Sequence, residues 1–194
     1  ESAFAVWRGE NGMQGLAHDG GRLPDEDAVR RAWRVLADKG DVLIQPLLAN
    51  HPVLAPVAAD DVAVTLRVVT RAGPEGISVW WAEMQVPGEV SPVGGRGFWR
   101  FPISVADGGV SALKREWFLK QDWQDEYDAL WQRLSVLEHV PYWEQICSYS
   151  MNAHQTLPKV WAIAWDWVIT PSGPVLLEGN GGLGLCEVQQ QGVD

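Results

Sequence analysis

The chain has 194 residues, of which 46% are hydrophobic and 21% are charged, as in ordinary folded domains. Its formal net charge of −10 at pH 7 argues against nucleic acid as a main partner, because phosphate backbones favour basic surfaces. No apolar run approaches the ~20 residues that a membrane-spanning helix needs, so we expect no membrane span. No secretory leader is visible and the two cysteines form no disulfide or zinc pattern, so we expect a cytoplasmic protein.

The first predicted element is a hairpin with a glycine-rich connection. Residues 3–7 are typical of a strand, and residues 16–18 begin its return. Between them, Gly9, Gly12 and Gly15 predict a flexible loop over residues 8–15 whose backbone can approach a ligand. A mobile turn without a ligand is the alternative. Because Glu1 lies almost at this strand, we expect a fragment of a longer protein.

A helix is predicted over residues 25–39, because an acidic first turn follows Pro24 and suits the helix dipole. Gly40 is expected to end it. The apolar stripe of this helix comprises Ala28, Ala32, Val35 and Leu36. Residues 42–44 then predict a short buried strand.

Three strands and two helices are predicted next, the strands over residues 62–71, 77–86 and 97–105, and the helices over residues 122–138 and 143–155. The segment 87–96 is left unassigned. On the first strand, alternation places Leu66 and Val68 on one face and Thr65 and Arg67 on the other. Arg67 is therefore a charge that points away from the more apolar face.

Two strands, over residues 160–170 and 174–180, are predicted to close the chain as a hairpin. If the turn holds the three residues 171–173, Asp166 falls directly opposite Glu178, with Cβ atoms about 4.5–5.5 Å apart. Asn180 lies two residues beyond Glu178 and so shares its face. Two carboxylates and an amide oxygen in apolar strands suit Mg²⁺, which usually takes one or two carboxylates together with phosphates. The alternative is a solvated pair on an exposed face, with Asn180 as a turn former.

The terminal hairpin resembles the end of ATP-grasp domains, and most closely the sugar-transfer-associated branch, which is related to D-alanine–D-alanine ligase-type carboxylate–amine ligases. The resemblance is carried by Ala164-Trp165-Asp166, by Gly-Pro-Val-Leu-Leu-Glu-Gly-Asn over residues 173–180, and by Gln189. Upstream, residues 43–48 with Asn50-His51-Pro52 are similar to the family's adenine-side hinge, and Thr-Leu-Arg-Val-Val-Thr at 65–70 resembles one of its strands. The similarity extends from about residue 3 to residue 190.

The resemblance implies a role for each matched residue. Asp166, Glu178 and Asn180 would be the magnesium ligands, and Arg67 would face the phosphate or acyl-phosphate as the catalytic residue. The adenine edge would meet the backbone of Gln45, Pro46, Leu47 and Leu48, and the triphosphate would lie under Arg8, Gly9, Gly12 and Gly15. The family's usual lysine ahead of this loop has no counterpart, and Trp7 or Arg8 stands in its place. His51 is a candidate for touching substrate, against a plain turn role.

The implied fold is α+β, an ATP-grasp fold of antiparallel sheets with flanking helices in two lobes, lacking an N-terminal domain. We expect residues 1–48 to form the small glycine-loop lobe and residues 49–194 the larger lobe with the metal site. The implied activity is an ATP- and Mg²⁺-dependent ligation of a carboxylate to an amine through an acyl-phosphate, with small-molecule substrates and a sugar-linked or cell-envelope acceptor by family analogy. The alternative is a non-catalytic nucleotide- or carbohydrate-binding module, which the 12 Trp residues and the missing lysine favour.

Overall fold

The computed structural model describes residues 4–9, 12–17, 22–41, 46, 48–58, 63–88, 97–112 and 121–182. Contacts divide the chain into two compact units, Glu1–Leu47 and Leu48–Asp194. Helices and antiparallel sheets occur in the chain, which confirms the expected α+β class. Within the described residues, no helix has the length and apolar character needed to cross a membrane.

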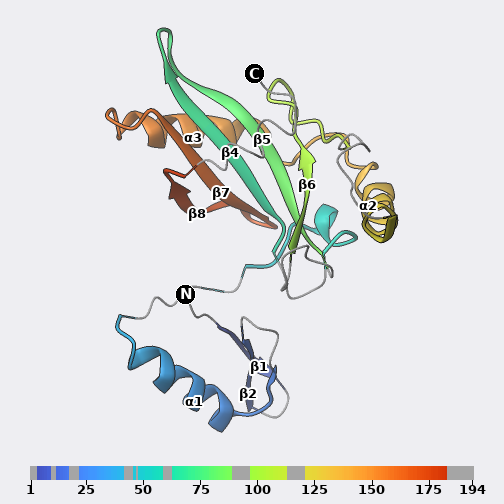
Figure 1. Cartoon of the computed structure of the whole chain (residues 1–194), viewed down its shortest axis with the longest axis vertical. Coiled ribbons are helices and arrows are strands. Elements are labelled where there is room, and N and C mark those ends of the chain that lie inside the picture. The colour runs from blue at the N-terminus through green and yellow to red at the C-terminus, as the bar shows by residue number, and fades with distance from the viewer. Residues whose placement is uncertain are drawn as a thin grey trace. The chain divides into compact units, whose positions relative to one another are not determined.

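The first unit begins with a hairpin whose strands stay paired as far as Gly9 and Gly12 (Figure 1). Strands β1 (Phe4–Gly9) and β2 (Gly12–Ala17) pair antiparallel up to Gly9 and Gly12, and β3 (Arg22–Leu23) adds a short third strand. The expected flexible loop over residues 8–15 is therefore wrong in extent. Gly12 pairs with Gly9 at the end of the ladder and has a φ of +103°, which glycine adopts without strain.

Helix α1 (Glu26–Ala37) confirms the predicted helix and its start. The Asp25 side chain accepts a hydrogen bond from the Ala28 backbone N–H at 2.8 Å and so caps the helix. Ala28 and Val29 are buried, whereas Val35 is 56% exposed, so its place in the predicted stripe is wrong. The helix contacts β2 and the two-residue β3, and its buried residues, Ala28 and Val29, lie in its first turn.

The second unit is built on a five-stranded antiparallel sheet in the order β6-β5-β4-β7-β8 (Figure 1). Its strands are β4 (Thr65–Gly73), β5 (Gly76–Gly88), β6 (Gly97–Pro102), β7 (Ala162–Thr170) and β8 (Gly173–Asn180). These are the five strands predicted for this part of the chain, with shifted ends. β6 stops before residue 105, because the chain turns back there and Ile103 bridges to Val110. The strand expected at 42–44 lies outside the described residues.

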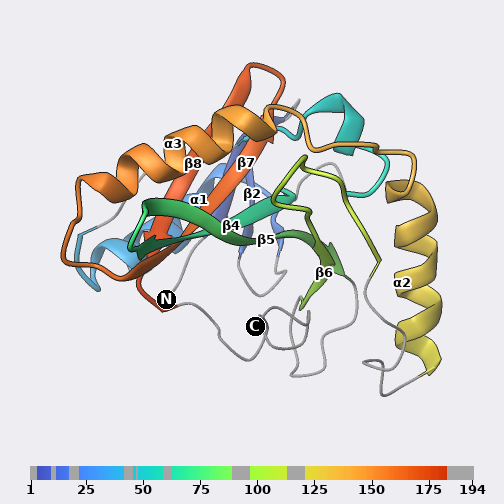
Figure 2. The ribbon, with the colours of Figure 1, turned by 90° about the horizontal axis from the view of Figure 1, so that it is seen from above.

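Helices cover one face of this sheet. Helix α3 (Trp143–Gln155) contacts β4, β5 and β7, and α2 (Gln121–Leu134) stands near β6 (Figure 2). The core between helices and sheet includes Leu66, Val68, Met84, Trp165 and Ile146, all at most 5% exposed. The predicted apolar face of β4 is thereby confirmed. α2 ends four residues earlier than predicted, and a short 3-10 helix, η1 (Pro52–Leu54), precedes the sheet.

A buried polar chain ties α3 to the sheet. The Trp165 indole Nε1 donates to the Thr70 hydroxyl at 2.8 Å, and that hydroxyl lies 2.7 Å from His154 Nδ1. His154 Nε2 lies 2.9 Å from the Val160 carbonyl oxygen, which only accepts, so Nε2 carries the proton. The Thr70 hydroxyl, which accepts from Trp165, can donate to Nδ1, so each polar side chain in this hydrogen-bonded series has a partner. His154 therefore packs in the core.

Candidate metal and nucleotide site

The sheet face opposite the helices carries a row of charged side chains. Glu83 on β5 pairs in register with Arg67 on β4, Arg67 pairs with Asp166 on β7, and Asp166 pairs with Glu178 on β8. Residues directly opposite each other in an antiparallel sheet point to the same face. Four strands therefore bring one guanidinium and three carboxylates into a single line, which we call the charged row.

Asp166 lies at the centre of the predicted metal site and is 7% exposed. Arg67 Nε donates to Asp166 Oδ1 and Arg67 Nη2 donates to Asp166 Oδ2, each at 2.8 Å, which makes a two-pronged ion pair. Asn180 Nδ2 donates to Asp166 Oδ2 at 3.2 Å and to Glu178 Oε1 at 2.9 Å. The three residues predicted to converge do so on one face, and Arg67 completes the cluster. Their role as metal ligands stays a prediction.

The predicted pairing of Asp166 with Glu178 is confirmed, whereas the predicted length of the turn between their strands is wrong. Thr170 pairs with Gly173, so the turn holds two residues rather than three. The register then shifts by one between Asp166 and Trp167, which leaves Leu177 as an extra residue in β8. This β-bulge restores the pairing that a two-residue turn alone would displace by one position.

A glycine between the two polar residues of β8 has a steric reason. Gly179 pairs with Trp165, whose ring lies across it on the helix side of the sheet. A Cβ at Gly179 would lie 2.7 Å from Trp165 Cζ3 and 2.9 Å from Cε3, closer than van der Waals contact permits. The ring thus packs over a bare backbone, while Glu178 and Asn180 point to the opposite face.

The charged row continues into a second polar group on β5 and β6. Glu83 is fully buried, and its Oε1 accepts hydrogen bonds from Gln85 Nε2 at 2.7 Å and from Arg100 Nη1 at 3.1 Å. Gln85 Oε1 in turn accepts from the Thr65 hydroxyl at 3.2 Å. The sequence reasoning missed Glu83, Gln85 and Arg100. The available signal was the alternation of Glu83 and Gln85 with the apolar Met84 in the predicted strand 77–86.

The donor atoms at Asp166 fit a hard divalent cation. Two carboxylates and one amide lie on one face of a rigid hairpin, and Mg²⁺ takes oxygen ligands of this kind. Among the described residues, no cluster of three or more His, Cys, Asp or Glu could hold a metal, so an amide must complete this donor set. Rotation of the Asn180 amide by half a turn presents its oxygen. Because Arg67 holds both Asp166 oxygens, a cation must displace at least one of these hydrogen bonds.

For the remaining predicted nucleotide-binding residues, the structure gives only the position in the chain or the strand. Arg8 pairs with Met13 and lies in β1, and Gly15 lies in β2. Pro46 and Leu48 are described, whereas Gln45 and Leu47 lie outside the described residues. All of these remain predictions as nucleotide-binding residues.

His51 takes the turn role. Its backbone N–H donates to the Ile169 carbonyl at 2.7 Å, and its Nδ1 accepts from the Val53 N–H at 3.3 Å, which caps η1. Its ring lies edge-on to Tyr142, with centroids 6.1 Å apart. A contact with substrate stays a prediction.

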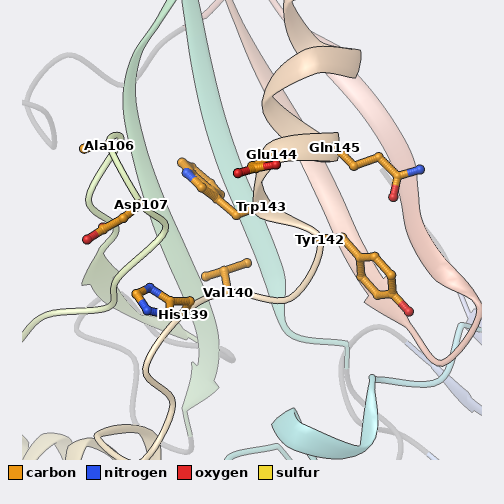
Figure 3. Close-up of a pocket in the computed structure, with 8 residues that line it drawn as sticks. All are labelled: Ala106, Asp107, His139, Val140, Tyr142, Trp143, Glu144 and Gln145. Atoms are coloured by element: carbon orange, nitrogen blue, oxygen red, sulfur yellow. The ribbon is translucent and has the colours of Figure 1, made fainter.

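A hollow of about 520 Å³ lies where the 106–107 turn meets residues 139–145, with Asp107 and His139 on one side and Gln145 on the other (Figure 3). Hydrogen bonds from the Ser104 side chain and the Gly109 N–H lower the pKa of Asp107. On α3, burial raises the pKa of the Cys147 thiol to about 11, so this thiol is protonated at neutral pH and is a poor nucleophile. The hollow shares no residue with the charged row.

A model of the sugar-transfer associated ATP-grasp family matches residues 34–193. The chain belongs to this family. The match includes β4, β7 and β8 and therefore all of Arg67, Asp166, Glu178 and Asn180, and it confirms the expected ATP-grasp fold. It begins within α1, so the glycine hairpin lies outside the matched part of this ATP-grasp chain. No curated protein and no solved structure matches the chain in the corresponding searches.

Proposed function

We propose that this chain supplies the nucleotide- and magnesium-binding part of an ATP-dependent ligase that joins a carboxylate to an amine. The observation that supports this most directly is the convergence of Asp166, Glu178 and Asn180 on one face of a hairpin beside Arg67. Family membership supports ligase-type ATP chemistry at the level of the reaction class. We propose small-molecule substrates, with a sugar-linked acceptor by family analogy.

The side chains of the charged row divide the work between binding and charge stabilisation. Asp166 and Glu178 would hold Mg²⁺, and Asn180 would complete the set with its amide oxygen. When bound, the cation neutralises phosphate charge and orients the triphosphate. Arg67 presents several N–H donors in a fixed fork, which suits the equatorial oxygens of a transferring phosphoryl group. Val69 and Ala164, which share this face two residues along β4 and β7, are inaccessible to water.

The reaction proceeds in two transfers. An oxygen of the substrate carboxylate attacks the γ-phosphorus, the bond to the β-γ bridging oxygen breaks, and ADP leaves. The amine then attacks the acyl carbon, phosphate leaves with the bonding electrons, and the amine loses a proton as the amide forms. Positioning and electrostatic stabilisation supply most of the rate in such transfers, so the row needs no general base of its own.

The test is a calorimetric titration of the full chain with a non-hydrolysable ATP analogue and MgCl₂. We expect Glu178→Gln to weaken binding at least tenfold, because it removes one of two carboxylates from an exposed position where it supports no core packing. Glu75→Gln, an exposed acid in the β4–β5 turn, is the matched control and should bind like the parent chain. Equal affinity of the parent chain and Glu178→Gln would refute the site. A separate assay with ATP itself, in which ADP release is measured after a carboxylate mixture is added, would test the ligase chemistry.

The second candidate is a non-catalytic nucleotide- or carbohydrate-binding module on the same fold. Two observations favour it. Arg67 holds both oxygens of Asp166, an arrangement in which the carboxylate has a partner without a cation. Trp161, 58% exposed and edge-on to Trp80 at 5.8 Å, offers an aromatic surface of the kind that stacks on sugar rings. Heat on titration with an oligosaccharide, and none with ATP and MgCl₂, would favour this candidate over the ligase.

A further inference from the structure

The charged row places Arg67 between two acids rather than beside one. Glu83 and Asp166 are its direct cross-strand partners on β5 and β7, and adjacent strands lie about 4.8 Å apart. Arg67 directs its fork to Asp166, through Nε and Nη2. A guanidinium in this position can therefore be balanced from either side of its own strand.

Glu83 is held as a fixed negative group. It is fully buried, and Gln85 and Arg100 both donate to its Oε1. A carboxylate buried in this way keeps its place because its hydrogen bonds and neighbouring positive charge offset the loss of water. Its position is set by rigid strands on both sides, since β5 lies between β4 and β6 in the sheet.

A cation at Asp166 creates a conflict that the row must resolve. The oxygens that would ligate the cation are those that Arg67 occupies, and the cation would repel a guanidinium at such short range. Arg67 must then withdraw at least one donor from Asp166 while its charge stays at the same place in the sheet. The negative group directly across on the other side is Glu83.

We propose that Glu83 is a positioning residue for the metal site, which acts by balancing Arg67 when Asp166 takes the cation. The inference rests on the proposed function, because it assumes that a divalent cation binds at Asp166. Glu83 touches neither the cation nor the nucleotide in this arrangement. Its effect on binding passes through Arg67 alone, and this dependence separates it from a residue that merely supports the fold.

The test is a double-mutant cycle on the full chain, with Mn²⁺ alone as the probe and its free fraction measured by electron paramagnetic resonance. Glu83→Gln keeps the shape of the side chain and an oxygen for Gln85 and Arg100, but removes the charge. We expect it to weaken Mn²⁺ binding about tenfold, because Arg67 then stays on Asp166. Arg67→Met should bind Mn²⁺ more tightly than the parent chain, and adding Glu83→Gln to it should change the affinity less than twofold.

Three results would overturn the inference. The first is Mn²⁺ binding by Glu83→Gln that equals that of the parent chain. The second is the same tenfold loss in the Arg67→Met background, which would mark Glu83 as a structural residue. The third is a parent chain that binds no Mn²⁺ with or without the ATP analogue, and this result would overturn the proposed function and the inference together. The circular dichroism spectrum of each variant should match that of the parent chain and of the Glu75→Gln control. A match shows that the weaker Mn²⁺ binding of Glu83→Gln does not come from misfolding.

Discussion

Gly179 gives a direct test of how the core holds the site, because one methyl group added there meets the Trp165 ring. The added Cβ would lie 2.7 Å from Cζ3, whereas carbon atoms pack best at about 3.5–4.0 Å, so ring and strand must separate by about 1 Å. Overpacking of this kind costs roughly 1–3 kcal/mol in a filled core. A separation of β8 from β7 also draws Glu178 and Asn180 away from Asp166.

We therefore expect Gly179→Ala to lower the thermal unfolding midpoint, by about 2–4 °C for each kcal/mol, and to weaken Mg²⁺–nucleotide binding at least tenfold. Gly181→Ala is the matched control, because a Cβ there has no atom within 4 Å. The control should be neutral or slightly stabilising, since alanine restricts the unfolded chain. The assays are differential scanning calorimetry and calorimetric titration. A Gly179→Ala chain as stable as the Gly181→Ala control would refute the packing of Trp165 on the glycine.

Further predictions concern Thr70, Cys147 and Asp25, which lie outside the charged row. Thr70→Val leaves Trp165 Nε1 and His154 Nδ1 without their buried partner and should lower the free energy of unfolding in urea by about 1–3 kcal/mol. Cys147, whose pKa is raised to about 11, should resist alkylation at pH 8, where roughly one thiol in a thousand is ionised. Because the unfolded thiol ionises first as pH rises, Cys147 should also make stability fall between pH 9 and pH 11. Asp25→Ala removes the cap of α1 and should cost the first unit about 1 kcal/mol, measured by helical circular dichroism on heating.

Each of these tests has its own control. Thr156→Val alters an exposed threonine at the end of α3. An equal effect of the two valine substitutions would contradict the buried hydrogen bonds that join Trp165, Thr70 and His154. Peptide mapping after alkylation follows Cys147 alone, with the urea-unfolded chain as the reactive reference. Asp38→Ala changes an exposed acid at the other end of α1, and a loss as large as that of Asp25→Ala would show that net charge, rather than capping, is responsible.

The parts of the site that sequence reasoning located are those that depend on neighbours along the chain. A hairpin fixes which residues face each other within a few positions of its turn, so Asp166, Glu178 and Asn180 could be brought together without a structure. The turn length could not be read in the same way, because the residues 171–173 suit two- and three-residue turns alike. Gly173 has a φ of +125° and closes the shorter turn, and the bulge then corrects the register.

The rest of the site depends on pairings between distant segments. Arg67 and Asp166 are 99 residues apart, and the pairing of β4 with β7 follows from how the whole sheet assembles. Alternation predicted only that Arg67 points away from the core. Its ion-pair partner Asp166 and its other cross-strand neighbour Glu83 lie on two different strands. Glu83 was missed for the same reason, since its charged partner Arg100 lies on a different strand, β6.

The extra residue in β8 has a consequence beyond the register of the site. β8 is the last strand of the described sheet, and Val175, Leu176 and Leu177 on it are each more than a third exposed. A straight apolar border of this kind recruits strands from other molecules and seeds aggregation. Because the irregularity at Leu177 breaks the even spacing of free amide and carbonyl groups, a second chain finds no continuous template there. The same local distortion that aligns Glu178 with Asp166 thus helps to keep individual molecules apart.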